Sequence, residues 1–515
     1  MDKKSVMPFL AVLYGAGFVS AFNENLVSVA LVDIMAEFGI TAGMAQWLVT
    51  GYMITTSIIV VVSAFLVQRF SLRKLFFTAS ICMIAGEFLC MVLPTYPLVL
   101  AARLLQAVGT GFFIPLMMNS VMAVAPRERL GTLLAIGSAC IVLGPAFAPV
   151  ISGAAATFFG WRFIFVFPMV ACAVFALAGL KLLRNIGEPK RIPLDIFSLI
   201  LAGIGLTLFV YGLGAVSTNL ALGLGTTVAG IAVLAWFVVR QGHLGVPMLE
   251  MSLMRNWRFS ISCFLVVVAM MMALPMGVLI PLFLVGTHGM SPLMAGIPVL
   301  PAALVNAVTA GLGGRIIDKK GPWPLIPLGL ALVLVGLLGM IWGGAIGSLA
   351  VVLVACVFVF GGVGFTMNPS QTTGLRILPP PMHPHGISIG NVLTLVAASI
   401  GTSLYVGVFE SAQFKALAQG AAEQSAVLSG FIAALVVAAI IAGAGLAVSI
   451  AYARKNDNRR IAPLLEELAA QFPGPPGGPG GESDGNRPVG PSEPGNEPGG
   501  SAWHDGERDN PGNRN

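Results

Sequence analysis

The chain has 515 residues, of which 57% are hydrophobic and only 10% are charged, and its net charge is +6. Apolar runs of about 20 residues, the length that crosses a bilayer, recur along it, so the composition excludes a soluble globular protein. The positive charge is spread over short connectors between these runs, which excludes the single basic face of a nucleic-acid-binding protein.

Fourteen apolar runs are predicted to be transmembrane helices. They cover residues 8–31, 45–67, 75–93, 97–120, 132–155, 162–181, 194–213, 222–240, 259–285, 292–312, 323–343, 348–368, 386–408 and 428–452. The sequence therefore predicts an all-α polytopic membrane protein. An even number of spans places both termini on the same side of the bilayer.

The distribution of Lys and Arg predicts which side that is. If the N-terminus is cytoplasmic, the cytoplasmic side holds 22 of the 28 basic residues, and the outer side holds only Arg162 and Lys415. Basic residues are retained on the cytoplasmic face. We therefore expect both termini in the cytoplasm, and a location in the cytoplasmic membrane of a bacterium. The first run ends without a small-residue cleavage site, so it is expected to remain as the first span.

The first span carries a polar stripe. Ser20, Glu24 and Ser28 recur at intervals of four residues, and Asn23 lies beside them. A carboxylate inside a bilayer is costly and usually functional. Glu24 is therefore a candidate for ion or solute movement.

Two further charges are predicted at the same depth, in the outer half of the membrane. They are Glu87 on the third span and Arg103 on the fourth, where Arg103, Gln106 and Thr110 share one helix face. The protonation of a carboxylate near an arginine depends on whether it faces that arginine or water. Glu24, Glu87 and Arg103 are thus predicted to couple protons to transport. The alternative is a fixed pair of Arg103 with either carboxylate that only holds the helices together.

A substrate cavity is predicted between the helices that carry these polar side chains. The residues expected to line it are Ser20, Asn23, Trp47, Gln106 and Thr110. The partners implied are a small-molecule substrate, protons and the lipid bilayer.

Weak internal repetition predicts how the spans are grouped. A short basic connector follows the second span, with Arg69, Arg73 and Lys74, and another follows the tenth, at residues 314–321. Related halves are common in transporters. We predict two six-helix bundles at 1–185 and 255–453, two linker helices within 186–254, and a cytoplasmic tail at 454–515. The tail is Pro- and Gly-rich and is expected to be disordered from about residue 471.

The sequence contains no signature of an enzyme. It has no Walker-type ATP motif, and its six cysteines lie inside spans without metal-type spacing. We expect no cofactor and no metal, and we predict a monomer driven by an ion gradient. His383 and His385 are expected in a solvated cytoplasmic turn.

Several short motifs together resemble a known family. Gly314, Asp318, Lys319 and Gly321 match the loop motif of the major facilitator superfamily, and Arg103 with Gln106 matches its fourth-span motif. Fifth-span residues resemble a motif typical of its exporters, namely Gly144, Pro145, Pro149 and Gly153. Over about residues 8–452 the chain is similar to the fourteen-span drug:proton antiporter family.

The chain also departs from that family's pattern. In the first loop motif the acid is replaced by Gln68 and the second glycine by Ser71, so Arg69, Arg73 and Lys74 need other partners for gating. In the first span the acid stands one position later, at Glu24, which turns it by about 100° around the helix.

The resemblance implies a major facilitator fold in which two bundles rock around a central cavity. It implies loop residues that latch helix ends in one transport state, and export of amphipathic drug-like compounds against proton entry. Two alternatives stay open. One is a dedicated exporter or importer of a single metabolite, and the other is a membrane sensor or scaffold that transports nothing.

Overall fold

The structure is a computed structural model that describes residues 3–126, 129–186, 195–215, 220–245, 247–290 and 292–455. Within these ranges, fourteen helical segments are long and apolar enough to cross a membrane, which confirms the predicted number of spans. The predicted tail beyond Lys455 lies outside the described residues.

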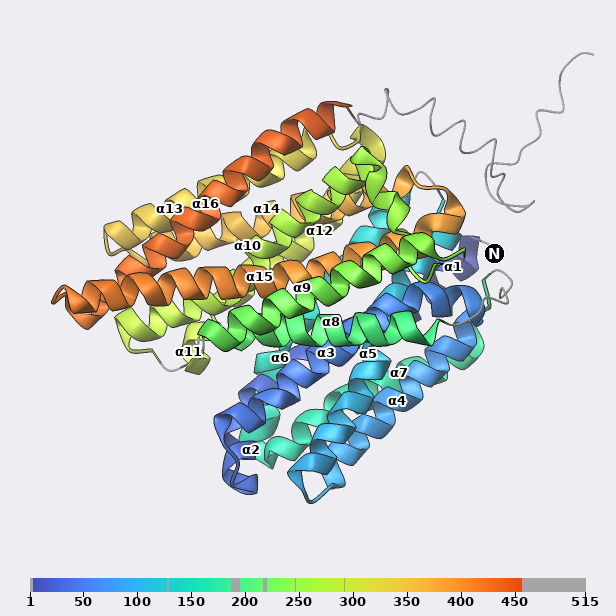
Figure 1. The fold of residues 1–515 in the computed structure, drawn as a ribbon, viewed down its shortest axis with the longest axis horizontal. Coiled ribbons are helices and arrows are strands. Elements are labelled where there is room, and N and C mark those ends of the chain that lie inside the picture. The colour runs from blue at the N-terminus through green and yellow to red at the C-terminus, as the bar shows by residue number, and fades with distance from the viewer. Residues whose placement is uncertain are drawn as a thin grey trace, which may run out of the picture. The chain divides into compact units, whose positions relative to one another are not determined.

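The first six spans pack into one bundle (Figure 1). Its elements are α1 (Lys3–Asn25), η1 (Leu26–Val29), α2 (Leu31–Phe38), α3 (Ala42–Arg69), α4 (Leu72–Val92), α5 (Tyr96–Val124), α6 (Leu130–Phe159), η3 (Trp161–Phe165) and α7 (Val166–Leu182). Buried apolar side chains such as Leu13, Phe76 and Phe113 join these helices. We call this group the N-terminal bundle.

The last six spans form a second bundle, here called the C-terminal bundle (Figure 1). Its elements are α10 (Trp257–His288), α11 (Pro292–Gly296), α12 (Val299–Lys320), α13 (Leu325–Ala345), α14 (Leu349–Arg376), η5 (Pro380–Met382), α15 (His383–Ala418) and α16 (Glu423–Lys455). Its own apolar core includes Phe283 and Phe431, whose rings stack with centroids 4.2 Å apart.

Two linker helices, α8 (Ile196–Ala215) and α9 (Leu220–His243), run between the bundles, and η4 (Met251–Arg255) leads on to α10 (Figure 1). Helix α8 packs on α3 of one bundle and on α15 of the other. Arg240 of α9 pairs with Asp195 at 3.1 Å, which ties the linker helices together at one end.

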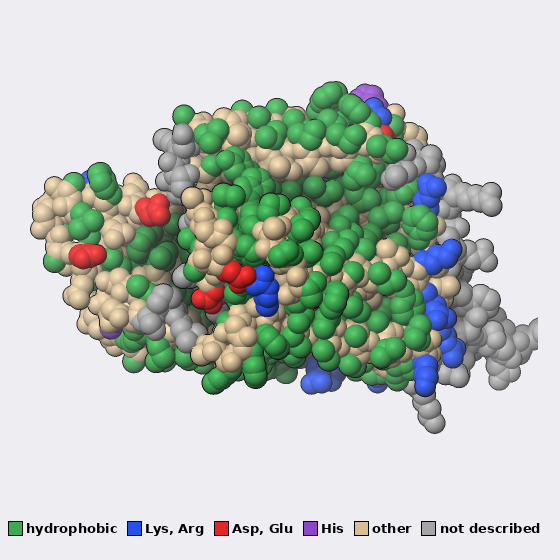
Figure 2. All heavy atoms as spheres, turned by 90° about the horizontal axis from the view of Figure 1, so that it is seen from below, with side chains coloured by type: hydrophobic (Ala, Val, Ile, Leu, Met, Phe, Trp, Pro, Cys, Tyr) green, Lys and Arg blue, Asp and Glu red, His purple; other side chains and the backbone are tan. Residues whose placement is uncertain are grey.

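Basic side chains gather at that same end of the helices. Helices α3, α7, α9, α12 and α14 all finish there with Lys or Arg in their last turn. Figure 2 shows most of the Lys and Arg side chains on the visible face at one end of the molecule. Cations at helix C-termini also interact favourably with the helix dipole. We refer to this as the basic end.

The helices extend beyond the apolar runs that predicted them. The expected solvated turn at His383 and His385 is wrong, because α15 begins at His383 and His385 is buried. Pro384 is compatible with the first turn of a helix, where no intrahelical N–H donor is needed.

Candidate functional site

A buried cluster of charged and amide side chains lies inside the N-terminal bundle. Arg103 of α5 donates from Nη1 to Asn23 Oδ1 at 2.8 Å and to Gln106 Oε1 at 2.6 Å. The two amides then donate to Glu87, Asn23 to Oε1 at 2.5 Å and Gln106 to Oε2 at 3.1 Å. All four side chains are buried. Glu87 is thus connected to Arg103 through two amides that each accept from the cation and donate to the anion.

Helix geometry explains how these groups meet. Helix α1 ends at Asn25, so the carbonyl of Asn23 has no partner within the helix, and it accepts from Arg103 Nη2 at 2.6 Å. Gly86 lets α4 approach α5 closely, because a Cβ there would lie 2.6 Å from Cγ of Gln106. The close approach places the neighbouring Glu87 within reach of α5.

Tyr52 of α3 completes the cluster, and the sequence reasoning did not single it out. The Arg103 guanidinium lies 3.9 Å from the centre of the Tyr52 ring, a cation–π distance. The Tyr52 hydroxyl lies 2.5 Å from Thr110 Oγ1, and Ser20 Oγ donates to the Thr110 carbonyl at 3.2 Å. A lone tyrosine in an apolar helix was the available signal, since its hydroxyl needs a partner when buried.

Glu24 is the exception among the predicted charges. It is half-buried on the last turn of α1, close enough to Arg103 for electrostatic interaction. Among the described residues, it makes no hydrogen bond or ion pair. The chain continues after Asn25 as the 3-10 turn η1, a change of helix type that often marks a hinge.

The structure therefore brings together most of the predicted residues, with one correction. A direct pair of Arg103 with Glu24 or Glu87 is wrong, because neither ion pair occurs in the described part of the chain. The two amides stand between the opposite charges instead. Trp47 lies apart from the cluster, 41% exposed, and its ring stacks on Tyr211 of α8 at 6.0 Å.

Of the fifth-span residues, Gly144 lies where α6 crosses α1. A Cβ on Gly144 would lie 2.6 Å from the backbone nitrogen of Phe22, one residue before Asn23. Pro145 and Pro149 lie inside α6, and the Gly153 carbonyl accepts from Thr157 at 2.7 Å. Gly144 therefore allows α6 to pack closely on the helix that carries Asn23 and Glu24.

A second polar cluster joins the two bundles at the basic end. Asp318 of α12 forms an ion pair with Arg376, and it accepts from the backbone N–H of Gly131 at 2.8 Å and of Thr132 at 2.7 Å. These N–H groups belong to the first turn of α6, where a carboxylate interacts favourably with the helix dipole. The acid of the loop motif thus caps a helix of the opposite bundle.

The glycines of this motif make the capping contact possible. A Cβ on Gly314 would lie 2.4 Å from the Gly131 carbonyl, so α12 and α6 approach each other too closely for any side chain there. Gly321 ends α12 with φ of 81°, a conformation that favours glycine. Lys319 is exposed.

The first-half connector is arranged differently. Arg73 donates to the Leu180 carbonyl at 3.2 Å, at the end of α7 in its own bundle, and Lys74 is exposed. Arg69 lies 5.7 Å from the ring centre of Phe65. The contacts of Arg73 with Leu180 and of Arg69 with Phe65 lie within the N-terminal bundle.

Gln68, which replaces the acid of the first loop motif, contacts the C-terminal bundle. Its Nε2 lies 3.0 Å from His385 Nε2 of α15, and His385 Nδ1 accepts from the Glu250 N–H at 3.3 Å. About one helical turn deeper, Ser63 lies 3.3 Å from Ser388. The bundles are therefore closed against each other at the basic end.

At the opposite end, Glu37 of α2 accepts from Trp161 Nε1 at 2.5 Å and from Arg162. The Arg162 bond holds the pKa of the Glu37 carboxyl below its ordinary value, although partial burial opposes it. This pair fastens α2 to η3.

No group of three or more possible metal ligands occurs among the described residues.

Comparison with known proteins identifies the family. The profile of the Major Facilitator Superfamily matches residues 13–402. The chain is 31% identical to the lincomycin resistance protein LmrB of Bacillus subtilis (strain 168) over 459 residues, covering 86% of this chain and 94% of that protein. It is 24% identical to the riboflavin transporter RibZ of Clostridioides difficile (strain 630), over 76% of this chain and 86% of that protein.

The fold agrees with this assignment. The solved structure of the proton:xylose symporter XylE bound to 6-bromo-6-deoxy-D-glucose superposes with a TM-score of 0.59 at 15% sequence identity, covering 85% of this chain and 95% of that one. Likeness at this identity shows the fold alone. The chain therefore belongs to the major facilitator superfamily, in its fourteen-span drug:proton antiporter family, and it is a multi-pass membrane transporter and not an enzyme.

Proposed function

We propose that this transporter exports amphipathic, drug-like compounds in exchange for protons, by alternating access of a site between its two bundles. The observation that carries the proposal is the arrangement of Glu87, two amides and Arg103, with Glu24 unpaired beside them. Carboxylates and arginines inside a membrane commonly belong to proton or substrate pathways. The resistance named in the relative LmrB supports the drug-like substrate class.

Proton binding at Glu87 offers a coupling step. Both of its oxygens accept from amide N–H groups. A protonated carboxyl is neutral, and the oxygen that carries the proton is a donor as well as a weaker acceptor. The amide N–H that faces this oxygen is then bound less strongly, which weakens the link from Glu87 to Arg103 through that amide. A proton therefore changes how α1, α4 and α5 are joined.

Glu24 is proposed as the group that exchanges protons with water or substrate. In the described part of the chain it has no hydrogen-bond or ion-pair partner that would fix its charge, and it follows Asn23, whose side chain and carbonyl both bind Arg103. A movement of the Arg103 side chain would therefore displace the last turn of α1, which carries Asn23 and Glu24. Ser20, Asn23, Gln106 and Thr110 would line the substrate path next to it, and Trp47 would do so nearer the linker.

We place the basic end in the cytoplasm, which puts both termini there, in a bacterial cytoplasmic membrane. The contacts of Asp318 then belong to a state closed to the cytoplasm. The gating loops of this state would include Gly314, Lys319, Gly321 and the connector residues Arg69, Arg73 and Lys74.

Single cysteines in place of Lys319 and Lys415 test the orientation. A membrane-impermeant maleimide added to intact cells should label only the second, and the reverse would contradict it.

Drug accumulation in a pump-deficient bacterial host tests the function. Cells that express the wild type should accumulate less lincomycin and less ethidium than empty-vector cells, and an uncoupler should abolish the difference. Accumulation equal to that of the empty vector would contradict drug export. Export that persists with the uncoupler would contradict proton coupling.

A single-metabolite transporter is the second candidate, favoured by the similarity to the riboflavin transporter RibZ. Uptake or release of labelled riboflavin separates the two candidates. Riboflavin movement without any effect on drug accumulation would favour the metabolite.

A further inference from the structure

The C-terminal bundle contains carboxamide side chains with unused hydrogen-bonding atoms. Asn368 of α14 is 4% exposed, and its buried Oδ1 has no hydrogen-bond partner among the residues that the structure describes. The Nδ2 atom of Asn391 on α15 is likewise buried and without a partner. Gln371 Nε2 lies 3.9 Å from the sulfur of Met118, a weak acceptor. Three amide side chains in this region thus have hydrogen-bonding atoms that the protein itself leaves without a strong partner.

These amides share the seam between the bundles. Gln371 reaches Met118 on α5 of the opposite bundle, and a Cβ on Gly390 of α15 would lie 3.6 Å from its Nε2. Asn368 precedes Gln371 by three residues, so the two share one face of α14. The Gln371 side chain also borders a small cavity lined by Ser262, Leu375 and Gly390.

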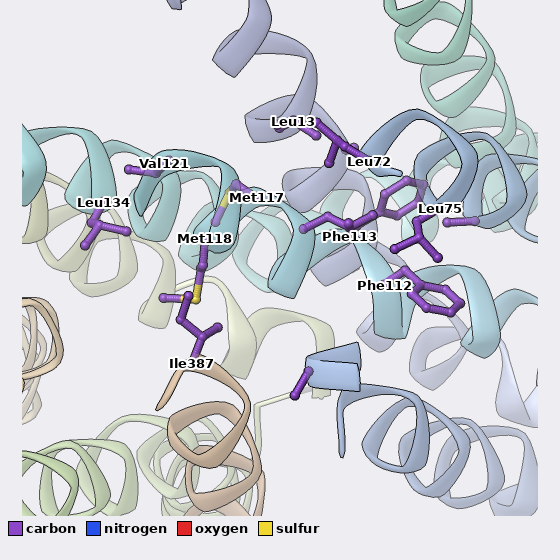
Figure 3. Packing of buried hydrophobic residues seen from close by; sticks show 14 of the residues in the cluster. Leu13, Leu72, Leu75, Phe112, Phe113, Met117, Met118, Val121, Leu134 and Ile387 are labelled. Atoms are coloured by element: carbon purple, nitrogen blue, oxygen red, sulfur yellow. The ribbon is translucent and has the colours of Figure 1, made fainter. Parts of the chain in front are cut away.

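Asn391 reaches the same seam from α15. Figure 3 shows Ile387 beside Met118, and Ile387 belongs to the apolar cluster that contains Met118. Asn391 follows Ile387 by four residues and therefore lies on the same helix face. Met118 is thus approached by Gln371 from α14 and by the Ile387–Asn391 face from α15.

The unpaired atoms of Asn368 and Asn391 argue against a purely structural role for these two side chains. A buried donor or acceptor that is left unpaired destabilises the folded protein. Asn119 of the same seam-forming helix α5 behaves as a structural amide does, since it donates to its own Pro115 carbonyl at 2.8 Å. Asn368 and Asn391 lack such a bond.

The surroundings of the amides are uncharged. Helix α14 from Leu349 to Leu375 and helix α15 from His383 to Phe409 contain no Asp, Glu, Lys or Arg. The Arg103 cluster lies in the other bundle, and the charge of Arg376, five residues after Gln371, is paired with Asp318. A ligand group bound by these amides is therefore selected by hydrogen bonding and not by charge.

We propose that Asn368, Gln371 and Asn391 form a neutral subsite that binds hydroxyl, carbonyl or amide groups of the transported compound. The inference rests on the proposed export function and adds the chemistry of recognition. A hydroxyl or an amide both donates and accepts, so it can satisfy an amide N–H and an amide oxygen together.

Two probes test the subsite in the full chain. Lincomycin carries hydroxyl groups and an amide, whereas tetraphenylphosphonium has no hydrogen-bonding group. Asn368→Leu and Asn391→Leu should each reduce lincomycin export about three- to tenfold, the range for one lost neutral hydrogen bond. Tetraphenylphosphonium export should stay within about twofold of the wild type. Asn119→Leu is the matched control and should not separate the two probes.

Other outcomes overturn the proposal. Equal losses for both probes, no loss for either, or a wild type that exports only tetraphenylphosphonium would each contradict a neutral hydrogen-bonding subsite. A wild type that moves neither probe contradicts the export function itself.

The melting temperature of the purified protein tests the role of the amides independently of transport. Because Asn391→Leu removes an unpaired donor, the purified empty protein should melt at the same temperature as the wild type or higher. Asn119→Leu, which loses a made bond, should melt lower. A clear decrease for Asn391→Leu would show that its amide supports the fold, and would overturn the subsite.

Discussion

At the scale of single residues, the amides determine how the buried charges coexist. Arg103 and Glu87 are both fully buried, and burying an ion without compensation is costly. Asn23 and Gln106 give each ion hydrogen bonds without placing the charges in contact. The arrangement keeps both charges bound and leaves the carboxylate able to accept a proton.

The bridging role of Gln106 predicts a large loss of stability. Gln106→Leu leaves Glu87 and Arg103 each short of one bond, and breaking a buried ionic network costs about 3–5 kcal/mol. The melting temperature of the purified protein should fall by several degrees. Gln46→Leu, at an exposed position of α3, is the control and should change little. An unchanged melting temperature for Gln106→Leu would contradict the bridge.

At the scale of elements, helix termini carry the contacts that join parts of the molecule. Asp318 near the end of α12 caps the start of α6, and the free carbonyl near the end of α1 binds Arg103. Both use backbone groups that a helix cannot satisfy internally.

Removing the charge of Asp318 should loosen the basic end. Asp318→Asn weakens the pair with Arg376 and the helix cap, and we expect a loss of about 3 kcal/mol. In a background without the native cysteines, a cysteine at Ser63, which is buried, should react faster with maleimide. Lys319→Gln should leave the rate unchanged. Equal rates in the Asp318→Asn and wild-type backgrounds would contradict the latch.

The contact of α2 with η3 should depend on pH. Because Arg162 holds the pKa of Glu37 below the ordinary value of 4.5, the pair contributes stability above that value and loses it as the pH falls. The wild type should melt above Glu37→Gln at about pH 7, and the difference should shrink toward about pH 3.5. A constant difference would contradict the assignment.

The sequence predicted more of the fold than of the candidate site. Hydropathy and the loop charges predicted the fourteen spans because a bilayer imposes both length and charge on each segment. Helical spacing placed Arg103 with Gln106, but it could not assign partners across helices. The role of Tyr52 and the two-amide bridge depend on crossings set by Gly86 and by the end of α1, which no single-helix pattern contains.

At the scale of the whole molecule, the two bundles carry different chemistry. The N-terminal bundle holds the charged cluster around Arg103, and the facing helices α14 and α15 of the C-terminal bundle offer neutral amides between Leu349 and Leu375 and between His383 and Phe409. The contacts of Asp318 and of Gln68 with His385 close the basic end between them. In the proposed transport cycle, rocking of the bundles would expose the seam to one side of the membrane at a time.

The most direct test of proton-coupled export is made with purified protein in liposomes. With an imposed pH gradient, the wild type should accumulate lincomycin or ethidium in the direction opposite to proton flow, and a pH dye should report matching proton movement. Glu24→Gln, which is nearly isosteric, should lose accumulation and proton movement while still exchanging substrate down its gradient. Undiminished gradient-driven accumulation by Glu24→Gln would contradict the coupling role of this carboxylate.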